Sequence, residues 1–486
     1  MQLNHPNLLK NKAYIDGKWR DAENGAVFAV TNPATGATLA SAPDMGAAET
    51  RAAIEAAQRA LPAWKKLSGK ERALILRKWH DRIVAAAADI ARIMTSEQGK
   101  PLAEANGEVL YAASFIEWFA EEGRRVYGDT MLAPGNDKRI VVIRQPIGVC
   151  AAITPWNFPA AMITRKAAPA LAAGCTMLVK PAEHTPLTAL ALAELAEQAG
   201  IPPGVFNVVT CAAASAPAVG RELTANPIVR KLSFTGSTEV GRLLMAQSAP
   251  TLKKLSLELG GNAPFIVFDD ADLDVAVDSA MASKFRNSGQ TCVCANRLLV
   301  QDGIYAAFVE KLTAKVRTLK VGNGAEAGVT QGPLIDADAL RKVEAQVADA
   351  AAKGGRILVG GKSHTSGGAF FEPTVIADAT PDMRCAREET FGPVAPVFRF
   401  STETEAITLA NDTEFGLASY FFTRDLNRVI RVAEALEYGM VGINTGLISN
   451  EVAPFGGVKQ SGFGREGSKY GIEEYLITKQ MCIGLS

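Results

Sequence analysis

Residues 148 to 260 decide the fold, because five strand-like runs alternate there with helical patterns: GVCAAIT (148–154), CTMLVK (175–180), VFNVVT (205–210), KLSFTG (231–236) and KKLSLELG (253–260). Such alternation is typical of right-handed βαβ units and predicts a parallel sheet covered by helices. A second alternation, from PFIVF (264–268) to MVGINTG (440–446), predicts another α/β domain. The fold class is therefore α/β.

Two further segments complete the predicted organisation. Residues 47–126 have a helical pattern without motifs, and we expect them to pack against the first sheet. The runs KRIVVIRQPIG (138–148) and YLITKQMCIGLS (475–486) are strand-like and could leave the body of the subunit. No repeat of fixed period and no Gly/Ser/Pro-rich linker marks a sharp boundary.

Composition bounds the class of protein. A chain of 486 residues exceeds the roughly 250 to 300 residues that one core supports, so at least two domains are expected. Fifty-one Lys and Arg residues balance fifty-one Asp and Glu residues, so no net field attracts nucleic acid or an anionic membrane. The apolar runs are shorter than the ~20 residues that cross a bilayer.

The amino terminus and the cysteines indicate the compartment. The first twenty residues lack the basic and then apolar pattern of a secretory signal, which predicts a cytoplasmic protein. Seven cysteines without regular spacing indicate reduced thiols rather than a disulfide framework.

The segment FRNSGQTCVCANR (285–297) places one thiol, Cys292, behind a polar, glycine-containing turn. An ordinary cysteine has a pKa near ~8.5, so a nucleophilic thiolate needs stabilisation from the dipoles of the turn or from a nearby positive charge. The alternative is a buried structural cysteine, which is the more frequent case for any one cysteine.

Five motifs accompany one another along nearly the whole chain: FRNSGQTCVCANR, ELGGNAP (258–264), TPWNFP (154–159), VKPAE (179–183) and EETFGP (388–393). Together they resemble the aldehyde dehydrogenase superfamily. The resemblance implies a Rossmann-type NAD(P)-binding domain from 1–128 and 148–259, a catalytic domain from 260–465, and an oligomerisation sheet from 129–147 and 466–486. It also implies a homo-oligomer, a dimer or a tetramer.

The same resemblance assigns the chemistry. Cys292 would attack the aldehyde, and Asn157 with the Cys292 backbone N–H would hold the alkoxide. Glu258 would be the base that hydrolyses the thioester, and Lys180 belongs to the same catalytic group. Each residue has a plainer alternative: Asn157, between two prolines, could form a turn, and Glu258 could be an ion-paired glutamate.

The dinucleotide site would lie where strands end and a helix begins near Thr238. Glu183 would repel a 2′-phosphate, which favours NAD, although Lys180 leaves room for NADP. Glu389 could also be a carboxylate at a helix start. The residues that the resemblance assigns to the cofactor are Thr154, Trp156, Lys180, Glu183, Gly236, Ser237, Gly241, Leu259, Glu389 and Phe391.

A narrower resemblance bears on the substrate. The run from Phe285 to Arg297 and the run ISNEVAPFGGVKQSGFGREGSKYGIEEYL (448–476) are similar to the dehydrogenases of succinate semialdehyde or glutarate semialdehyde. Arg165 and Arg286 would hold the substrate carboxylate with help from Ser449. Alternatively, both arginines form internal salt bridges. One methylene separates the two substrates, so the sequence does not choose between them.

Cys294 lies two residues after Cys292 and, in the similar enzymes, such a pair can act as a redox switch. No second Cys or His cluster completes a metal site, so none is predicted. Two other classes compete with a dehydrogenase. One is a cysteine hydrolase without a cofactor, although none of the four histidines lies in these motifs; the other is a protein that kept the fold without activity.

Overall fold

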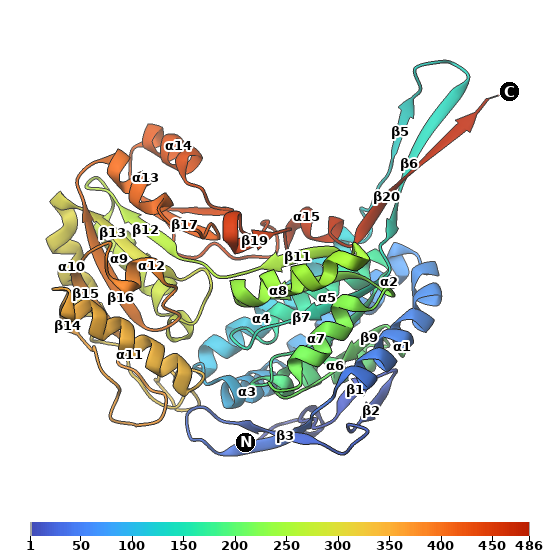
Figure 1. Cartoon of the computed structure of the whole chain (residues 1–486), viewed down its shortest axis with the longest axis horizontal. Coiled ribbons are helices and arrows are strands. Elements are labelled where there is room, and N and C mark those ends of the chain that lie inside the picture. The colour runs from blue at the N-terminus through green and yellow to red at the C-terminus, as the bar shows by residue number, and fades with distance from the viewer. Residues whose placement is uncertain (1, 486) are drawn as a thin grey trace.

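The computed structural model describes residues 2–485; Met1 and Ser486, which end the first and last predicted segments, lie outside the described residues. Its largest sheet has the order β19-β11-β10-β7-β8-β9-β1-β2 (Figure 1). The strands at its centre are parallel, as the alternation predicts. Their bounds are β7 Val149–Ile153, β8 Thr176–Lys180, β9 Phe206–Val208, β10 Val229–Thr235 and β11 Lys254–Glu258.

Short antiparallel strands close both edges of this sheet: β1 (Ala13–Ile15) and β2 (Lys18–Arg20) at one edge, and β19 (Gly462–Phe463) at the other. A separate hairpin, β3 (Val27–Thr31) and β4 (Thr38–Pro43), precedes the helices.

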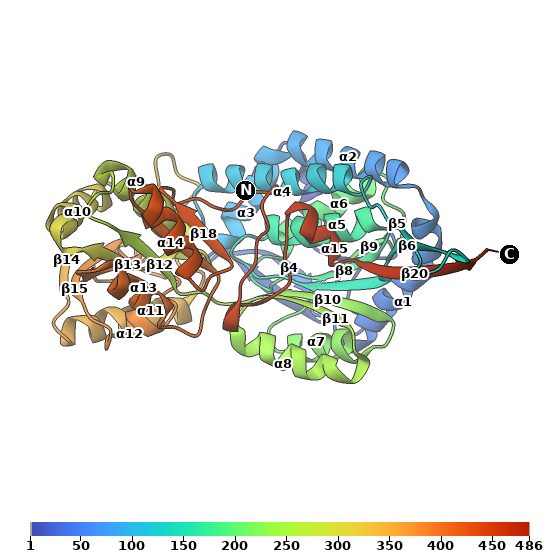
Figure 2. The ribbon, with the colours of Figure 1, turned by 90° about the horizontal axis from the view of Figure 1, so that it is seen from above.

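Helices cover both faces of the first sheet (Figure 2). The predicted helical segment forms most of one layer, and the alternating segment supplies the rest. On one face lie α2 Gly69–Ala85, α3 Ala87–Gln98, α4 Leu102–Glu122, α5 Ala161–Ala173 and α6 Pro186–Gln198. On the other face lie α1 Ala47–Lys66, α7 Ala216–Ala225 and α8 Thr238–Ser248.

The second sheet has the order β14-β15-β16-β13-β12-β17-β18, and all its pairs are parallel except β14 with β15. It confirms the second α/β unit. The strands are β12 Ala263–Val267, β13 Ala295–Gln301, β14 Arg356–Val359, β15 Thr374–Ala379, β16 Val394–Phe400, β17 Ala418–Phe422 and β18 Met440–Ile443. The helices are α9 Leu273–Lys284, α10 Asp302–Val316, α11 Ala337–Ala352, α12 Arg384–Arg387, α13 Glu403–Asn411 and α14 Leu426–Ala435.

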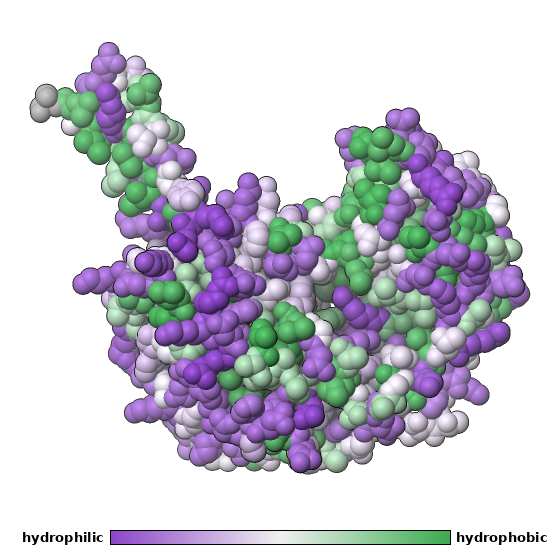
Figure 3. Space-filling view, turned by 180° about the vertical axis from the view of Figure 1, so that it is seen from behind, coloured by the Kyte–Doolittle hydropathy of each residue, from purple (hydrophilic) through white to green (hydrophobic). Residues whose placement is uncertain are grey.

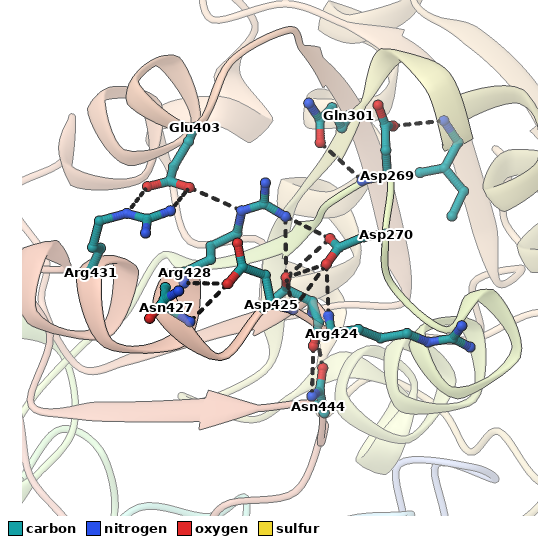
Figure 4. A network of polar contacts seen from close by, with 12 residues as sticks. Asp269, Asp270, Gln301, Glu403, Arg424, Asp425, Asn427, Arg428, Arg431 and Asn444 are labelled. Carbon is teal, nitrogen blue, oxygen red and sulfur yellow. Dashed lines mark hydrogen bonds and ion pairs between the residues drawn. The ribbon is translucent and has the colours of Figure 1, made fainter.

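A polar network fixes α14 to this sheet (Figure 4). The Arg428 guanidinium lies between two carboxylates, 2.6 Å from Asp270 and 3.0 Å from Glu403. Asp270, just beyond β12, also accepts hydrogen bonds from Thr423 and from the backbone N–H of Arg424. Because several charges share these contacts, the network holds the helix more firmly than separate surface pairs would.

A three-stranded arm projects from the body (Figure 1). It has the order β20-β6-β5, with β5 Asp129–Leu132, β6 Lys138–Pro146 and β20 Leu476–Gly484. Figure 3 shows apolar side chains along it, and exposed members are Met131, Leu132, Ile477, Met481 and Ile483. Before β20, the short helix α15 (Ser468–Glu473) packs on α4 and α5 instead of joining the arm. No helix within residues 2–485 is long and apolar enough to span a membrane.

Candidate active site

The candidate site is a cavity of about 260 Å³ between the two sheets. On one side lie the carboxyl ends of β7, β10 and β11; on the other lie the segments that lead into β12, β13 and β16. Its lining includes eight predicted residues: Trp156, Asn157, Gly236, Ser237, Leu259, Cys292, Glu389 and Phe391. Asn157 and Cys292 thus meet because the carboxyl ends of the first-sheet strands face the segments that enter the second sheet.

The loop that carries Cys292 begins where α9 ends. Asn287 and Ser288 have φ values of 51° and 53°, a left-handed conformation that needs external support in residues with a side chain. That support comes from Glu104, which accepts from the Asn287 backbone N–H at 2.7 Å, and from the Gly332 carbonyl, which accepts from the Ser288 hydroxyl at 2.9 Å. The turn is therefore held in place before Cys292 is reached.

Cys292 is half-buried and borders the cavity. Its pKa is raised to about 12, mainly by burial and also by the charge of Glu389, while Arg165 is the main group that lowers it. Desolvation is the largest influence on this pKa, so stabilisation of a thiolate by the dipoles of the turn stays a prediction. A nearby positive charge is therefore the more important of the two predicted sources of thiolate stabilisation.

Asn157 is buried, and its side-chain Nδ2 donates to the Gln290 carbonyl at 3.0 Å. A primary amide has two N–H groups, so one stays free to donate into the cavity. Within residues 2–485 the backbone N–H of Cys292 has no hydrogen-bond acceptor either. Asn157 does more than form a turn, because its amide lines the same cavity as the thiol.

Glu258 ends β11 and is almost fully buried. Neither of its carboxylate oxygens has a hydrogen-bond partner in the described part of the chain, so the alternative of an ion-paired surface glutamate does not hold. Burial raises its pKa well above the usual range, and the nearby charge of Glu466 raises it further. A carboxyl group with a raised pKa is suited to accept a proton near neutral pH.

Two aromatic rings flank the cavity: Trp156 and Phe391 meet edge to face with centroids 5.6 Å apart. Gly236 and Ser237 also line the cavity and lead into the amino terminus of α8, where the Ser237 side chain accepts from the Val240 N–H at 3.3 Å. The Ser237 O–H proton thus stays available for an anion at this helix terminus.

Glu389 accepts from the Gly261 N–H at 3.1 Å, and burial raises its pKa to about 7. It follows α12, which ends at Arg387, so it is not a carboxylate at a helix start. The Thr154 hydroxyl is buried without a hydrogen-bond partner in residues 2–485, and the residue itself does not line the cavity. Gly241 lies against Leu259, where a Cβ would come within 2.5 Å of that side chain. Gly241 therefore affects the cavity only through Leu259, which lines it.

Lys180 and Glu183 form an ion pair of 3.5 Å beyond the end of β8. Burial alone would raise the pKa of Glu183, but Lys180 and backbone hydrogen bonding hold it below its usual value. Glu183 is therefore ionised at neutral pH, as a discriminator against a 2′-phosphate must be.

Arg165 is fully buried and pairs with Glu466, which Lys166 also contacts. Arg165 thus forms the internal salt bridge that was the alternative prediction, but only through its Nε edge. Its Nη2 atom has no partner in the described residues, and the rings of Phe455 and Phe115 lie 3.9 Å and 5.6 Å from its central carbon. The Nη2 edge of the guanidinium therefore remains able to donate to a carboxylate.

Arg286 has no ion pair within residues 2–485, and its guanidinium carbon lies 5.2 Å from the Phe158 ring centroid. Both arginines influence the titration of Tyr111, whose hydroxyl is buried without a partner in residues 2–485. Burial raises the pKa of Tyr111, and the two arginines oppose that shift. Ser449 is half-buried in a loop, and no hydrogen bond joins it to either arginine in the described residues, so its role stays a prediction.

The sequence prediction missed Ala339 and Lys342 on α11, which line the cavity, and Tyr111 on α4, whose pKa both arginines affect. No motif surrounds them, so nothing in the sequence could have found them.

Cys294 is buried, and its Sγ donates to the Lys284 carbonyl at 3.7 Å. A disulfide with Cys292 stays a prediction. None of the four histidines lines the cavity, so the thiol has no imidazole partner there.

Comparisons with known proteins agree with this geometry. The model of the aldehyde dehydrogenase family matches residues 19–481. The glutarate-semialdehyde dehydrogenase of Pseudomonas aeruginosa is 67% identical over 484 residues, and the NADP-linked succinate-semialdehyde dehydrogenase of Escherichia coli is 67% identical over 485 residues; both matches cover 100% of each chain.

Among solved structures, succinate-semialdehyde dehydrogenase from Burkholderia pseudomallei superposes with a TM-score of 0.99 at 64% identity, over 100% of both chains. The similarity therefore extends to both sheets and to the arm.

Proposed function

The chain belongs to the aldehyde dehydrogenase family, and from this premise we propose that it oxidises succinate semialdehyde to succinate with NAD or NADP. The choice of substrate rests on two arginines, Arg165 and Arg286. Arg165 lowers the pKa of Cys292, and its Nη2 atom has no hydrogen-bond partner in the described residues. Arg286 has no ion pair in the described residues. Both guanidinium groups and the Cys292 thiol act on the pKa of one residue, Tyr111, and two such cations suit an aldehyde with a carboxylate at its far end. Glutarate semialdehyde is the alternative substrate.

The cavity fits the family's dinucleotide. The Trp156 and Phe391 rings and the amino terminus of α8 provide polar and stacking contacts for it. Glu389 would accept from ribose hydroxyls, and Lys180 with Glu183 would contact the adenosine ribose. When bound, this group supplies the hydride acceptor.

In the reaction we propose, the Cys292 thiol first loses its proton to solvent; the thiolate sulfur then forms a bond to the aldehyde carbon, and the π electrons of the C=O bond move to the oxygen, which becomes an alkoxide. The free Asn157 N–H and the Cys292 backbone N–H donate to that oxygen. Loss of hydride converts the thiohemiacetal to a thioester. Glu258 then takes a proton from water, the resulting hydroxide attacks the thioester carbon, and the carbon–sulfur bond breaks to release the acid and the thiolate.

The test compares kcat/KM for succinate semialdehyde, glutarate semialdehyde and butanal. A preference for the acids of roughly 100-fold or more supports the arginine pair. Arg286→Met should remove most of that preference and leave butanal turnover intact, because no ion-pair partner is stranded. Lys342→Met, which removes a cation on the other side of the cavity, is the matched control and should keep the preference. Equal rates for acids and butanal would overturn the proposed substrate.

The cofactor choice rests on Glu183. We expect NAD to be favoured and NADP to be accepted through Lys180, and the NADP-linked relative from Escherichia coli is consistent with dual use. Glu183→Gln should raise kcat/KM for NADP relative to NAD, because it removes the charge that opposes the 2′-phosphate. An unchanged ratio would show that other residues make the choice.

We also propose a homo-oligomer that forms through the arm. The β5 and β20 edges are unpaired, and Leu132 is 84% exposed. Such an edge with apolar side chains is typical of a surface covered by another chain. Light scattering coupled to gel filtration should give a dimer or a tetramer, and a monomer would contradict the proposal. The cytoplasmic location stays a prediction.

A further inference from the structure

The connection between α3 and α4 lies directly behind the candidate site, although its sequence showed no motif. Four polar side chains there face the site segments: Gln98, Lys100, Glu104 and Glu108. The Lys100 and Glu108 side chains are each only 1% exposed. A buried ion pair is often less stabilising than apolar residues of the same volume, because both charges lose their hydration. The presence of this pair therefore calls for an explanation from its contacts.

Lys100 holds the backbone of Asn157. Its Nζ contacts the Glu108 carboxylate and donates to the Asn157 carbonyl at 2.7 Å. The ammonium also lies 4.0 Å from the Phe158 ring centroid, so the neighbouring residue is held by the same group. Asn157 is thus fastened through its main chain, which leaves its side chain free to act.

Glu108 extends this attachment to the start of α5. Its Oε1 accepts from the Ala160 N–H at 2.9 Å and from the Ala161 N–H at 3.3 Å. The Lys100–Glu108 pair therefore holds the Asn157 segment at two points. A carboxylate at the helix amino terminus also suits the helix dipole.

The thiol loop is fastened to the same place. The Asn287 side chain donates to the Asn157 carbonyl at 3.0 Å and accepts from Gln98 at 3.0 Å. The Gln290 carbonyl accepts from both Asn157 at 3.0 Å and Asn287 at 3.2 Å. One hydrogen-bonded unit therefore connects the proposed alkoxide donor to the loop that carries Cys292.

We propose that Lys100 and Glu108 are positioning residues that set the Asn157 amide at the distance from Cys292 that the alkoxide requires. This inference rests on the proposed function, in which Asn157 donates to the alkoxide. The pair touches neither substrate nor cofactor and acts only through Asn157. Its effect belongs to the transition state, because the alkoxide forms only there, so kcat should change and KM should not.

The experiment measures kcat and KM for succinate semialdehyde in Glu108→Gln and Lys100→Met. Glu108→Gln keeps an oxygen for the Ala160 N–H but removes the counter-charge of Lys100. We expect kcat to fall roughly 10- to 100-fold with KM changed less than about twofold, as for a small misplacement of a catalytic group. Melting temperatures show whether each variant is folded.

Glu97→Gln is the matched control. Glu97 is a buried carboxylate on α3 that accepts from the Leu187 and Thr188 N–H groups at the start of α6, away from the cavity. It should change the melting temperature and leave kcat within about twofold of the parent enzyme. If it lowers kcat as much as Glu108→Gln does, the effect is a general loss of packing and the inference fails.

A double-mutant cycle separates positioning from structure. In an Asn157→Ala background, Glu108→Gln should lower kcat less than about twofold, because the group that it positions is gone. An equal decrease with and without Asn157, or no decrease in a folded Glu108→Gln enzyme, would overturn the inference. If the parent enzyme reduces neither NAD nor NADP with any semialdehyde, the proposed function fails instead, and this result is distinct from the others.

Discussion

Glu389 offers a direct test of how burial controls the charge of this site. Its pKa is raised from 4.5 to about 7 by burial, which corresponds to about 3 kcal/mol between the two protonation states. Since the folded state resists ionisation, the parent protein loses stability as pH rises from 4.5 to 7. Glu389→Gln cannot ionise and keeps an oxygen for the Gly261 N–H.

The advantage of Glu389→Gln should therefore grow by about 1.4 kcal/mol per pH unit between pH 5.5 and 7 and level off above 7. For a domain of roughly 200 residues, each kcal/mol moves the melting temperature by roughly 2 to 4 °C, so melts at pH 5.5, 6.2, 7 and 8 resolve the trend. The KM for the cofactor should rise at the same time, because the ribose loses a charged acceptor.

The adjacent glutamate is the matched control. Glu388 accepts from Arg384 at 2.9 and 3.0 Å, and these bonds hold its pKa below the usual value. A group with a lowered pKa loses its contribution only as pH falls below the unfolded value, so Glu388→Gln should differ from the parent by a constant amount from pH 5.5 to 8. If Glu389→Gln gives the same flat difference, the Glu389 carboxylate is solvated and the argument from burial is refuted.

Three further predictions concern the charges around the thiol. Alkylation of Cys292 by iodoacetamide should accelerate about tenfold per pH unit from 7 to 9, since its pKa is about 12; mass spectrometry separates it from the exposed Cys482, and a plateau near pH 8 would contradict the raised pKa. Glu258→Gln should release one reduced cofactor per active site in a burst and then stop, because thioester formation does not need the base; steady turnover at the parent rate would exclude Glu258 as the base. Glu466→Gln leaves Arg165 and Lys166 without their shared carboxylate and should cost about 3 to 5 kcal/mol in denaturant unfolding, whereas a cost below about 1 kcal/mol would show that the cluster is hydrated.

The sequence predicts the parts of this molecule that depend on local patterns. Alternating strands and helices indicate both parallel sheets, and the strand ends place Thr154, Lys180 and Glu258 at one edge before any coordinates are known. Cys292 comes from the segment before β13 of the second sheet, and the cavity between the sheets brings it to Asn157. Local motifs and sheet topology are sufficient for this much.

Contacts between distant segments could not be predicted in the same way. Lys100 and Asn157 are 57 residues apart, and neither lies in a pattern that points to the other. The raised pKa of Cys292 could not be predicted either, because the depth of burial and the position of Glu389 depend on packing of the whole domain. Charges that act through space need the tertiary structure.

The electrostatics of the cavity suggest an order for its chemistry. Burial, Glu389 and Glu258 all raise the pKa of Cys292, and Arg165 is the main group that opposes them. By themselves these residues keep the thiol protonated at neutral pH, which protects it from side reactions. A positive charge brought between Trp156 and Phe391 would lower the pKa of Cys292, and a dinucleotide with an oxidised nicotinamide carries such a charge. Alkylation of Cys292 at pH 7.5 should therefore accelerate when NAD is added and slow when reduced NAD replaces it, since only the oxidised ring is cationic; equal rates with both forms would show that the thiolate is stabilised in another way.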